Sequence, residues 1–177
     1  EEIQPTVSVI NDVSASMLLP SEIKLNAAVS LAGIFMSSAI NSECAVSWWT
    51  FGNGMSSLWP LSRFFPEKVP DKIDGTKTLA EELSSLAQPL PRHGLKIVIS
   101  DFLWQDPPPD TIRSLMKDGC ALIMICVLCQ EEIKPALGGI FSLSDSEKGG
   151  RLDIEIAQTE RDAYADRIST HLDLWKE

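Results

Sequence analysis

The sequence is poor in positive charge and in histidine. Its 177 residues carry 15 Lys and Arg against 25 Asp and Glu, a formal net charge of −10 at pH 7, with two histidines. Nucleic acids and anionic membranes select surfaces rich in Lys and Arg, so we expect this chain to contact neither. The acidic balance is compatible with cation binding and with a basic partner surface, although such a charge is also ordinary for solubility.

Long apolar runs and paired cysteines are also scarce. No run approaches the roughly 20 residues that a membrane-spanning helix needs, and no signal peptide stands at the observed start. The longest run, residues 120–129, is predicted to be a buried strand. Cys120, Cys126 and Cys129 lie in or beside it as small hydrophobic residues, without the second Cys/His pair of a zinc site. We therefore expect free cysteines and a cytoplasmic location.

Apolar runs alternate with helical stretches along the chain. Strands are predicted at residues 7–11, 44–51, 55–61, 95–100, 121–128, 140–143 and 152–156. Helices are predicted at 23–40, 78–87, 111–117 and from about 159 onward. This alternation favours a doubly wound α/β fold with a mostly parallel central sheet flanked by helices, and the length fits a single domain over residues 1–177.

A short polar run follows the first predicted strand. Residues 12–16 read Asp-x-Ser-x-Ser. In an extended backbone alternate side chains point the same way, so Asp12, Ser14 and Ser16 present one carboxylate and two hydroxyls together. These hard oxygen donors suit Mg²⁺ or Mn²⁺. The motif alone is weak evidence, because Asp and Ser also serve turns and helix N-caps.

Two further segments complete a candidate metal site. Asp101 ends the strand predicted at 95–100, and the loop at 74–78 carries Thr76 and Thr78 just before a predicted helix. In open α/β sheets ligands bind beyond the carboxyl ends of the strands, where the strand order reverses. If the first and fourth strands are neighbours there, Asp12 and Asp101 converge.

The three segments together resemble the metal-ion-dependent adhesion site of von Willebrand factor A domains. More narrowly, the chain resembles the bacterial and archaeal A-like domains associated with MoxR-type AAA+ ATPases. Lys24 follows the motif ahead of an Ala-rich helix, and Phe102 follows Asp101 where many adhesion domains have glycine. After the fifth strand the family often carries Asp-Pro and then Glu; here residues 129–132 read Cys-Gln-Glu-Glu, which keeps the Glu alone.

The resemblance implies a ligand set for Mg²⁺ or Mn²⁺. Ser14 and Ser16 would bind the metal directly, and Asp12 and Asp101 would supply negative charge directly or through water. Thr76 would bind directly in one state and through water in another. The resemblance selects Thr76 over Thr78, which the chemistry of the side chains alone does not separate.

The resemblance also implies a non-enzymatic, metal-dependent protein–protein interaction module. Its partner would donate an Asp or Glu carboxylate, and a MoxR-type AAA+ ATPase is expected, in complex assembly or chaperone-like work. Trp104 is a candidate anchor on the rim, since interface hot spots favour Trp, with packing as the alternative. The family often has an upstream segment, sometimes with membrane spans, so the full-length protein can be membrane-anchored.

Two rival functions remain open from the sequence. One is a metal-assisted hydrolase or phosphotransferase that uses Asp12 as nucleophile or base. Against it, no second acid lies two residues from Asp12 and no Gly-rich phosphate loop is present. The other is a scaffold whose degenerate site holds no metal. Because Asp12 is expected on a solvent-facing loop, we expect Asp12→Ala to abolish metal and partner binding and to leave the fold intact.

Overall fold

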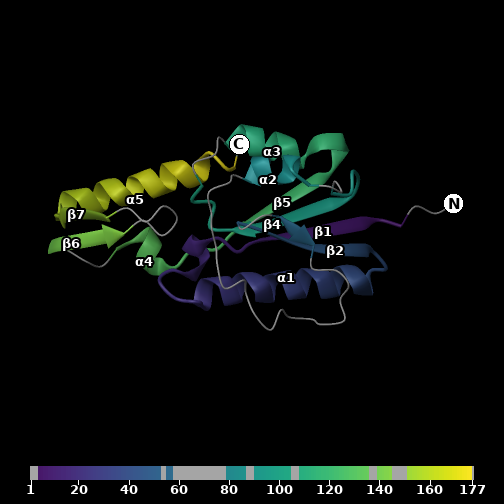
Figure 1. Ribbon diagram of the computed structural model, residues 1–177, viewed down its shortest axis with the longest axis horizontal. Helices are drawn as coiled ribbons and strands as arrows, with labels where there is room; N and C mark the ends of the chain where they lie inside the picture. The colour runs from purple at the N-terminus through teal and green to yellow at the C-terminus, as the bar shows by residue number, and fades with distance from the viewer. Residues whose placement is uncertain are drawn as a thin grey trace.

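The computed structural model describes residues 4–52, 55–57, 79–86, 90–104, 108–135, 139–144 and 151–176. At its centre, five strands form one sheet in the order β3-β2-β1-β4-β5 (Figure 1). These strands are β1 (Thr6–Asp12), β2 (Ala45–Phe51), β3 (Ser56–Ser57), β4 (Leu95–Ser100) and β5 (Ala121–Cys126). All neighbours are parallel except the short edge strand β3, which pairs antiparallel with β2. The predicted α/β class with a mostly parallel sheet is confirmed.

Strand β1 is the centre of the sheet. Six of its seven residues are buried, as expected for an apolar strand paired on both edges. Val9 lies opposite Trp48 of β2 on one side and Ile97 of β4 on the other. Side chains alternate between the two faces of a strand, so Val9 packs in one core cluster and Ile10 in the other.

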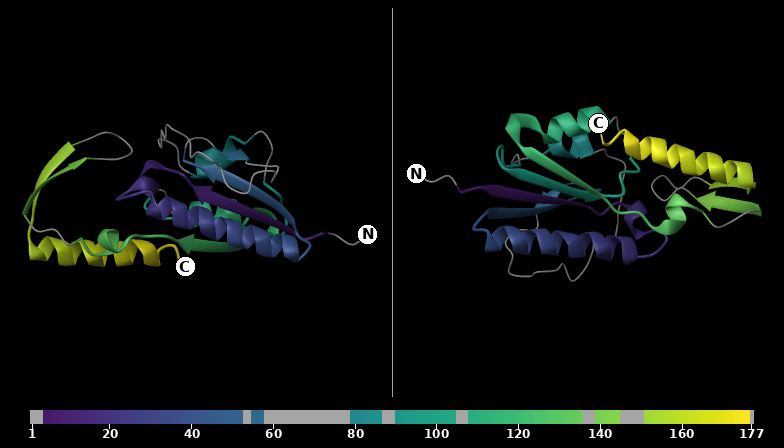
Figure 2. Two further views of the ribbon diagram at one scale, coloured as in Figure 1. Left: turned by 90° about the horizontal axis from the view of Figure 1, so that it is seen from below. Right: turned by 180° about the vertical axis from the view of Figure 1, so that it is seen from behind.

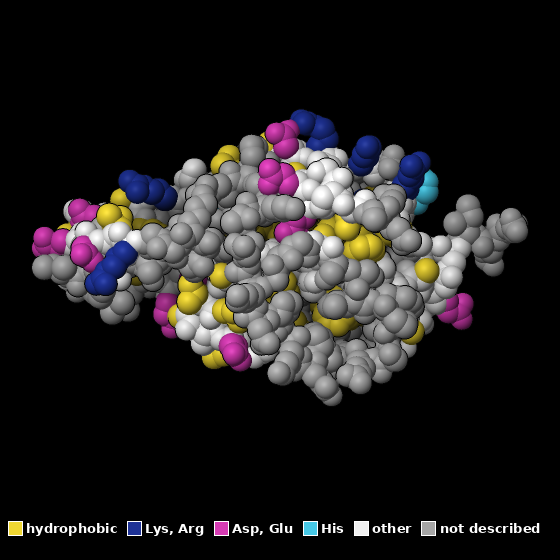
Figure 3. Space-filling view, in the orientation of Figure 1, with side chains coloured by type: hydrophobic (Ala, Val, Ile, Leu, Met, Phe, Trp, Pro, Cys, Tyr) yellow, Lys and Arg dark blue, Asp and Glu magenta, His cyan; other side chains and the backbone are white. Residues whose placement is uncertain are grey.

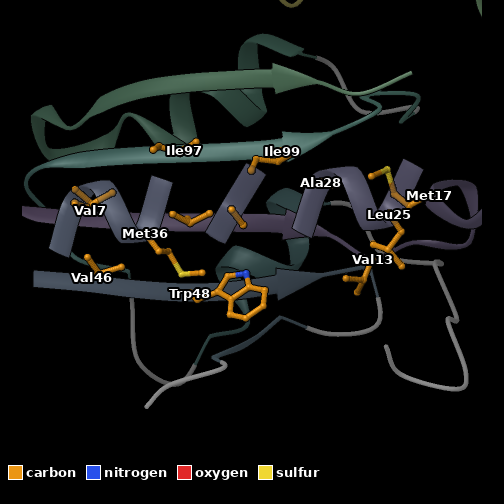
Figure 4. Close-up of a cluster of buried hydrophobic side chains, with 13 residues drawn as sticks. Val7, Val13, Met17, Leu25, Ala28, Met36, Val46, Trp48, Ile97 and Ile99 are labelled. Carbon is orange, nitrogen blue, oxygen red and sulfur yellow. The ribbon is translucent and has the colours of Figure 1, made fainter. Parts of the chain in front are cut away.

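Helices cover both faces of this sheet. Helix α1 (Ile23–Asn41) lies along one face, and α2 (Leu79–Ser84) and α3 (Pro108–Leu115) lie on the opposite face (Figure 1). Under α1, Met36 packs with Trp48 and Ile97 (Figure 4). On the other face, Leu79 and Leu115 pack against the sheet. The fold is therefore doubly wound, as predicted.

Helix α1 is unusually apolar, and Lys24 is its only charged residue. In the described part of the chain it is the one helix long and apolar enough to cross a membrane by length and composition, which corrects the expectation that no such stretch exists. Here one side of α1 packs on the sheet, while Ile23 and Ile34 are 72% and 64% exposed. Core helices of soluble proteins pass the same test.

The C-terminal part extends beyond the carboxyl ends of the strands. After the short helix α4 (Gln130–Ile133), β6 (Gly139–Ser144) and β7 (Arg151–Ile156) form a separate antiparallel hairpin. Helix α5 (Gln158–Asp173) then runs back toward the main sheet (Figure 2). Just after α5, the ring of Trp175 lies 5.1 Å from that of Phe102 and 5.2 Å from that of Trp104. These aromatic contacts attach the end of the chain to the sheet.

Strand β5 differs from the sequence-based expectation of a buried strand. Within the described residues it pairs with β4 alone, so its other edge carries no neighbour. Ile123 is 42% exposed and Cys126 is exposed, because an edge strand has less of each face covered. All four cysteines are free, as expected, but Cys120 alone is fully buried.

The aromatic attachment of the C-terminus predicts a large effect of one substitution. Trp175 is 5% exposed, whereas its neighbour Leu174 is 51% exposed. We expect Trp175→Ala to lower the free energy of unfolding by about 3 kcal/mol or more, because it leaves a cavity beside Phe102 and Trp104. Leu174→Ala is the matched control and should change it by about 0.5 kcal/mol or less. Urea unfolding measures both; similar losses would contradict the packing described.

Candidate metal centre

The two predicted acids meet at the point where the strand order reverses. From β1 the chain passes to β2 on one side and later returns to β4 on the other, and β1 pairs directly with β4. Asp12 is the last residue of β1, and Asp101 follows the last residue of β4. Both carboxylates are 0% exposed. The expected convergence at a topological switch point is therefore present.

Strand alternation gives the two acids different partners. Residues two positions apart in a strand point to the same face of the sheet. Asp12 and Ser100 therefore point to the face of Ile10 and Val98, which belong to the core cluster opposite α1. Asp101 is two positions from Ile99 and points to the other face, where Ile99 packs under α1. This explains why Ser100 reaches Asp12, whereas Asp101 reaches the lysine of α1.

Asp12 is held by three donors. Its Oδ1 accepts the backbone N–H of Ser14 at 2.8 Å. Its Oδ2 accepts the hydroxyl of Ser100 at 2.5 Å and the indole N–H of Trp104 at 3.0 Å. Asp12 is therefore not a solvent-facing acid, and that expectation was wrong. Asp12→Ala would leave these buried donors without their acceptor, so the fold would lose stability along with any ligand.

The two motif serines bring their hydroxyls together. Ser14 Oγ and Ser16 Oγ lie 3.1 Å apart. Adjacent ligands of an octahedral ion with bonds of about 2.1 Å are separated by about 3.0 Å, so this spacing fits Mg²⁺. The backbone is not extended throughout, because Ser16 lies in the short 3₁₀ helix η1 (Ala15–Leu18). A turn, rather than strand alternation, brings the hydroxyls together.

The end of β2 fixes the position of this motif. The N–H of Val13 donates to the carbonyl of Phe51 at 2.9 Å. The next residue, Gly52, has φ +107°, and a Cβ there would lie 2.7 Å from the backbone nitrogen of Ser14. The Gly52 N–H in turn faces both carboxylate oxygens of buried Glu82 at 3.2 Å. A glycine is therefore required for the close approach of these two loops.

Asp101 is paired with a lysine. Lys24 Nζ donates to Asp101 Oδ2 at 3.0 Å and to Glu132 Oε1 at 2.6 Å, and the lysine side chain is 0% exposed. The other oxygen of Asp101 accepts the N–H of Leu103 at 3.1 Å. Glu132 also receives the N–H of Cys129 at 2.8 Å and so caps α4. Glu132 is one of the two acids in the Cys-Gln-Glu-Glu run after the fifth strand.

Burial and charge shift the pKa values of this cluster. Burial, and then the nearby charge of Asp101, raise the pKa of Asp12 to about 6, although hydrogen bonds from Ser100 and Ser14 act the other way. Burial by itself lowers the pKa of Lys24, but the hydrogen bond to Glu132 and the charge of Asp101 outweigh it and raise the pKa. The lysine is thus charged at neutral pH.

Phe102 occupies a strained position beside the site. Its φ is +55°, in the left-handed region that favours glycine. A glycine would adopt this conformation without strain. Phe102 is 2% exposed, and its ring packs against Trp104 and Trp175. The aromatic packing holds the strained backbone, and Phe102 is a packing residue.

The structure brings together Asp12, Ser14, Ser16 and Asp101 of the predicted ligands. Thr76 and the alternative Thr78 lie outside the described residues. Trp104 is partly buried in the aromatic cluster and donates to Asp12, so it positions a site residue; its role at a partner-binding rim stays a prediction. No group of three His, Cys, Asp or Glu side chains suited to a metal occurs among the described residues, so a metal bound at Asp12 would depend on the serine hydroxyls.

Sequence reasoning missed three residues of the site. Ser100 directly precedes the predicted acid Asp101, so the two side chains point to opposite faces of the sheet. That alternation was the available signal that Ser100 contacts Asp12. Lys24 was noted as a family feature without a role. Glu82 gave no local signal, because its contact with Gly52 depends on how α2 packs.

A family model for the protein of unknown function DUF58 matches residues 1–173. The chain belongs to the DUF58 family. No curated protein matches the sequence of this DUF58 chain. The conserved hypothetical protein BatB from Bacteroides thetaiotaomicron is similar in structure, with a TM-score of 0.53, 15% identity and coverage of 97% of this chain and 96% of that one.

A second similar structure is an aerotolerance-related membrane protein from Bacteroides fragilis, solved with multiple mutations to serines. It matches with a TM-score of 0.52 and 14% identity, over 98% of each chain. At these identities the likeness shows the fold alone. Both structures share the α/β fold of this DUF58 chain.

The raised pKa of Asp12 predicts a pH-dependent stability. The folded protein holds this proton more tightly than the unfolded chain, whose ordinary pKa is 3.8. The stabilisation is therefore complete below pH 4 and is lost as the pH rises through 6. In EDTA, the unfolding free energy of the wild type relative to Asp12→Asn should fall by about 2 kcal/mol between pH 4 and pH 7.5. A difference independent of pH would contradict the assignment.

The close approach of Gly52 predicts a loss larger than backbone strain alone. Gly119→Ala is the matched control, because Gly119 has φ +78° and open space around the added Cβ. We expect about 1–2 kcal/mol of destabilisation there. Gly52→Ala should lower the free energy of unfolding by more than Gly119→Ala does. It should also shift the amide resonance of Ser14, because the added Cβ would displace the Ser14 backbone. Equal losses with an unchanged Ser14 resonance would contradict the contact.

Proposed function

We propose that this chain is a non-enzymatic, metal-dependent protein–protein interaction module. Asp12, Ser14 and Ser16 would hold Mg²⁺ or Mn²⁺, with Asp101 and Thr76 completing the set. The observation that carries this proposal is the pair of serine hydroxyls 3.1 Å apart beside a buried carboxylate at the switch point of the sheet. When bound, the ion supplies a Lewis-acidic position open to a carboxylate of a partner.

The chain's own residues set the chemistry of this position. Asp12 is oriented by Ser100 and Trp104 through its Oδ2, so its carboxylate cannot swing toward solvent while these bonds hold. Ser14 and Ser16 would be uncharged metal ligands. An ion with few anionic ligands keeps more of its positive charge and so attracts a partner carboxylate more strongly. The same burial disfavours Asp12 as a nucleophile, which supports an interaction module over the rival hydrolase or phosphotransferase.

The surface around the motif suits a protein partner. Between Ser16 and Lys24 the chain exposes Leu19 and Ile23, at 47% and 72%. Exposed apolar side chains next to a polar anchor point are typical of protein interfaces. On the face drawn in Figure 3, the described Lys and Arg side chains lie in separate spots at the left end and along the upper edge of the molecule. The proposal that the domain does not bind nucleic acid or a membrane surface rests on the net charge of −10.

The proposed partner is a MoxR-type AAA+ ATPase, in complex assembly or chaperone-like work. This part of the proposal rests on the resemblance of the three motifs to A-like domains associated with such ATPases. One structural neighbour is described as a membrane protein, which supports the proposal that the full-length protein is membrane-anchored. The cytoplasmic side for this domain stays a prediction from the sequence.

Calorimetric titration of the EDTA-stripped protein with Mg²⁺ and Mn²⁺ tests this function. We expect saturable binding that Ser16→Ala weakens by about tenfold or more, because a direct ligand is removed. Ser30→Ala is the matched control, since its hydroxyl lies on the exposed side of α1 and bonds the carbonyl of Asn26.

A second series in acetate supplies the carboxylate that a partner would bring. Binding that is unchanged in Ser16→Ala, or no binding in either buffer by a folded wild type, would contradict the proposal and favour a scaffold with an empty site.

A further inference from the structure

The buried lysine of α1 is paired with one of the proposed metal ligands. Lys24 is the only charged residue of a 19-residue apolar helix. Its Nζ is fully buried and stands 3.0 Å from Asp101 Oδ2, at the end of β4. A buried charge of this kind is costly unless it is paired, so its presence in an otherwise apolar helix calls for a local counter-charge. Asp101 and Glu132 supply that counter-charge.

The same carboxylate belongs to the proposed ligand set. Asp101 lies close enough to Asp12 for its charge to disfavour ionisation of Asp12. This negative charge is balanced by the Lys24 ammonium. A divalent cation bound at Asp12, Ser14 and Ser16 would be repelled by the positive charge of Lys24, which is paired with Asp101.

We propose that the Lys24 ammonium acts as a built-in cation that opposes metal binding by occupying Asp101. This inference rests on the metal site proposed above. Binding of the ion then weakens the Lys24–Asp101 pair, and the pair weakens binding of the ion. The affinity for metal is therefore lower than it would be with the oxygen ligands alone. A partner that donates a carboxylate adds the negative charge needed to favour the metal.

Glu132 makes the release of Asp101 feasible. Lys24 has three N–H donors, and one of them is bonded to Glu132 Oε1 at 2.6 Å. When Asp101 turns to a metal, the ammonium keeps this partner and is not left as an unpaired buried charge. Glu132 is itself fixed, because its other oxygen accepts the N–H of Cys129 at the start of α4. The lysine would thus keep one carboxylate partner after Asp101 turned away.

Lys24→Gln tests the inference directly, because it keeps a hydrogen-bond donor near Asp101 and removes the charge. Calorimetric titration at pH 7.5 should show Mg²⁺ and Mn²⁺ binding about tenfold tighter, or more, than in the wild type. Lys24→Arg, which keeps the charge, should bind no more tightly than the wild type. Lys96→Gln is the matched control, since Lys96 is also buried but donates to the carbonyl of Leu115 at 2.7 Å, away from the site.

A second variant and a second measurement cover the case in which Lys24→Gln does not fold. The double variant Lys24→Met/Glu132→Gln removes the lysine together with one of its two acids, and it should also bind metal more tightly. In the wild type, the ¹³Cε–¹Hε resonance of Lys24, assigned by its absence from Lys24→Arg, should shift along the metal titration.

The outcomes separate this inference from the proposed function. Tighter binding in a charge-removing variant supports both. Equal binding in the wild type and that variant, or a Lys24 resonance that does not move while metal binds, overturns the competing role of Lys24 and leaves the metal site standing. No binding by any folded form overturns the proposed metal function and this inference together.

Discussion

The burial of two carboxylates side by side is the constraint on which the rest of this site depends. Asp12 and Asp101 are removed from water at the ends of two adjacent strands, and each must be compensated by donors or by opposite charge. The compensation differs between them. Neutral donors from Ser14, Ser100 and Trp104 surround Asp12, whereas Asp101 receives the full charge of Lys24. Because its donors are neutral, Asp12 keeps a negative charge that favours binding of a proton or a cation. The charge of Asp101 is already neutralised by Lys24.

Polar and apolar interactions are joined in one structure here. The indole of Trp104 donates to Asp12 and also packs edge-on against Phe51 and Trp175. Trp175 follows the C-terminal helix, so the packing of the last residues supports the orientation of an acid at the end of the first strand. Phe102 adds a strained backbone held by the same rings. The geometry of the site is therefore set by a core cluster as much as by its own hydrogen bonds.

Strong local patterns made much of the fold predictable. The bounds of the fourth strand, the alternation of strands with the longer helices, and the two short strands near the C-terminus follow from apolar runs punctuated by turn residues. The short helix α4 was not predicted. Burial was harder to predict, because it depends on neighbours: the apolar run of β5 lies at an edge, and Asp12 lies inside rather than in a loop facing solvent. The Lys24–Glu132 pair spans 108 positions in the sequence, and no local pattern could place it. The polar motifs predicted that Asp12 and Asp101 lie near each other, but they could not reveal that Lys24 bonds to Asp101.

Crystals of the protein soaked in Mn²⁺ and measured for anomalous scattering test the central claim most directly. The account predicts an anomalous peak about 2.2 Å from the hydroxyls of Ser14 and Ser16, with the ammonium of Lys24 turned from Asp101 toward Glu132. Ordered density for these residues without a manganese peak, and with Lys24 still on Asp101, would contradict it.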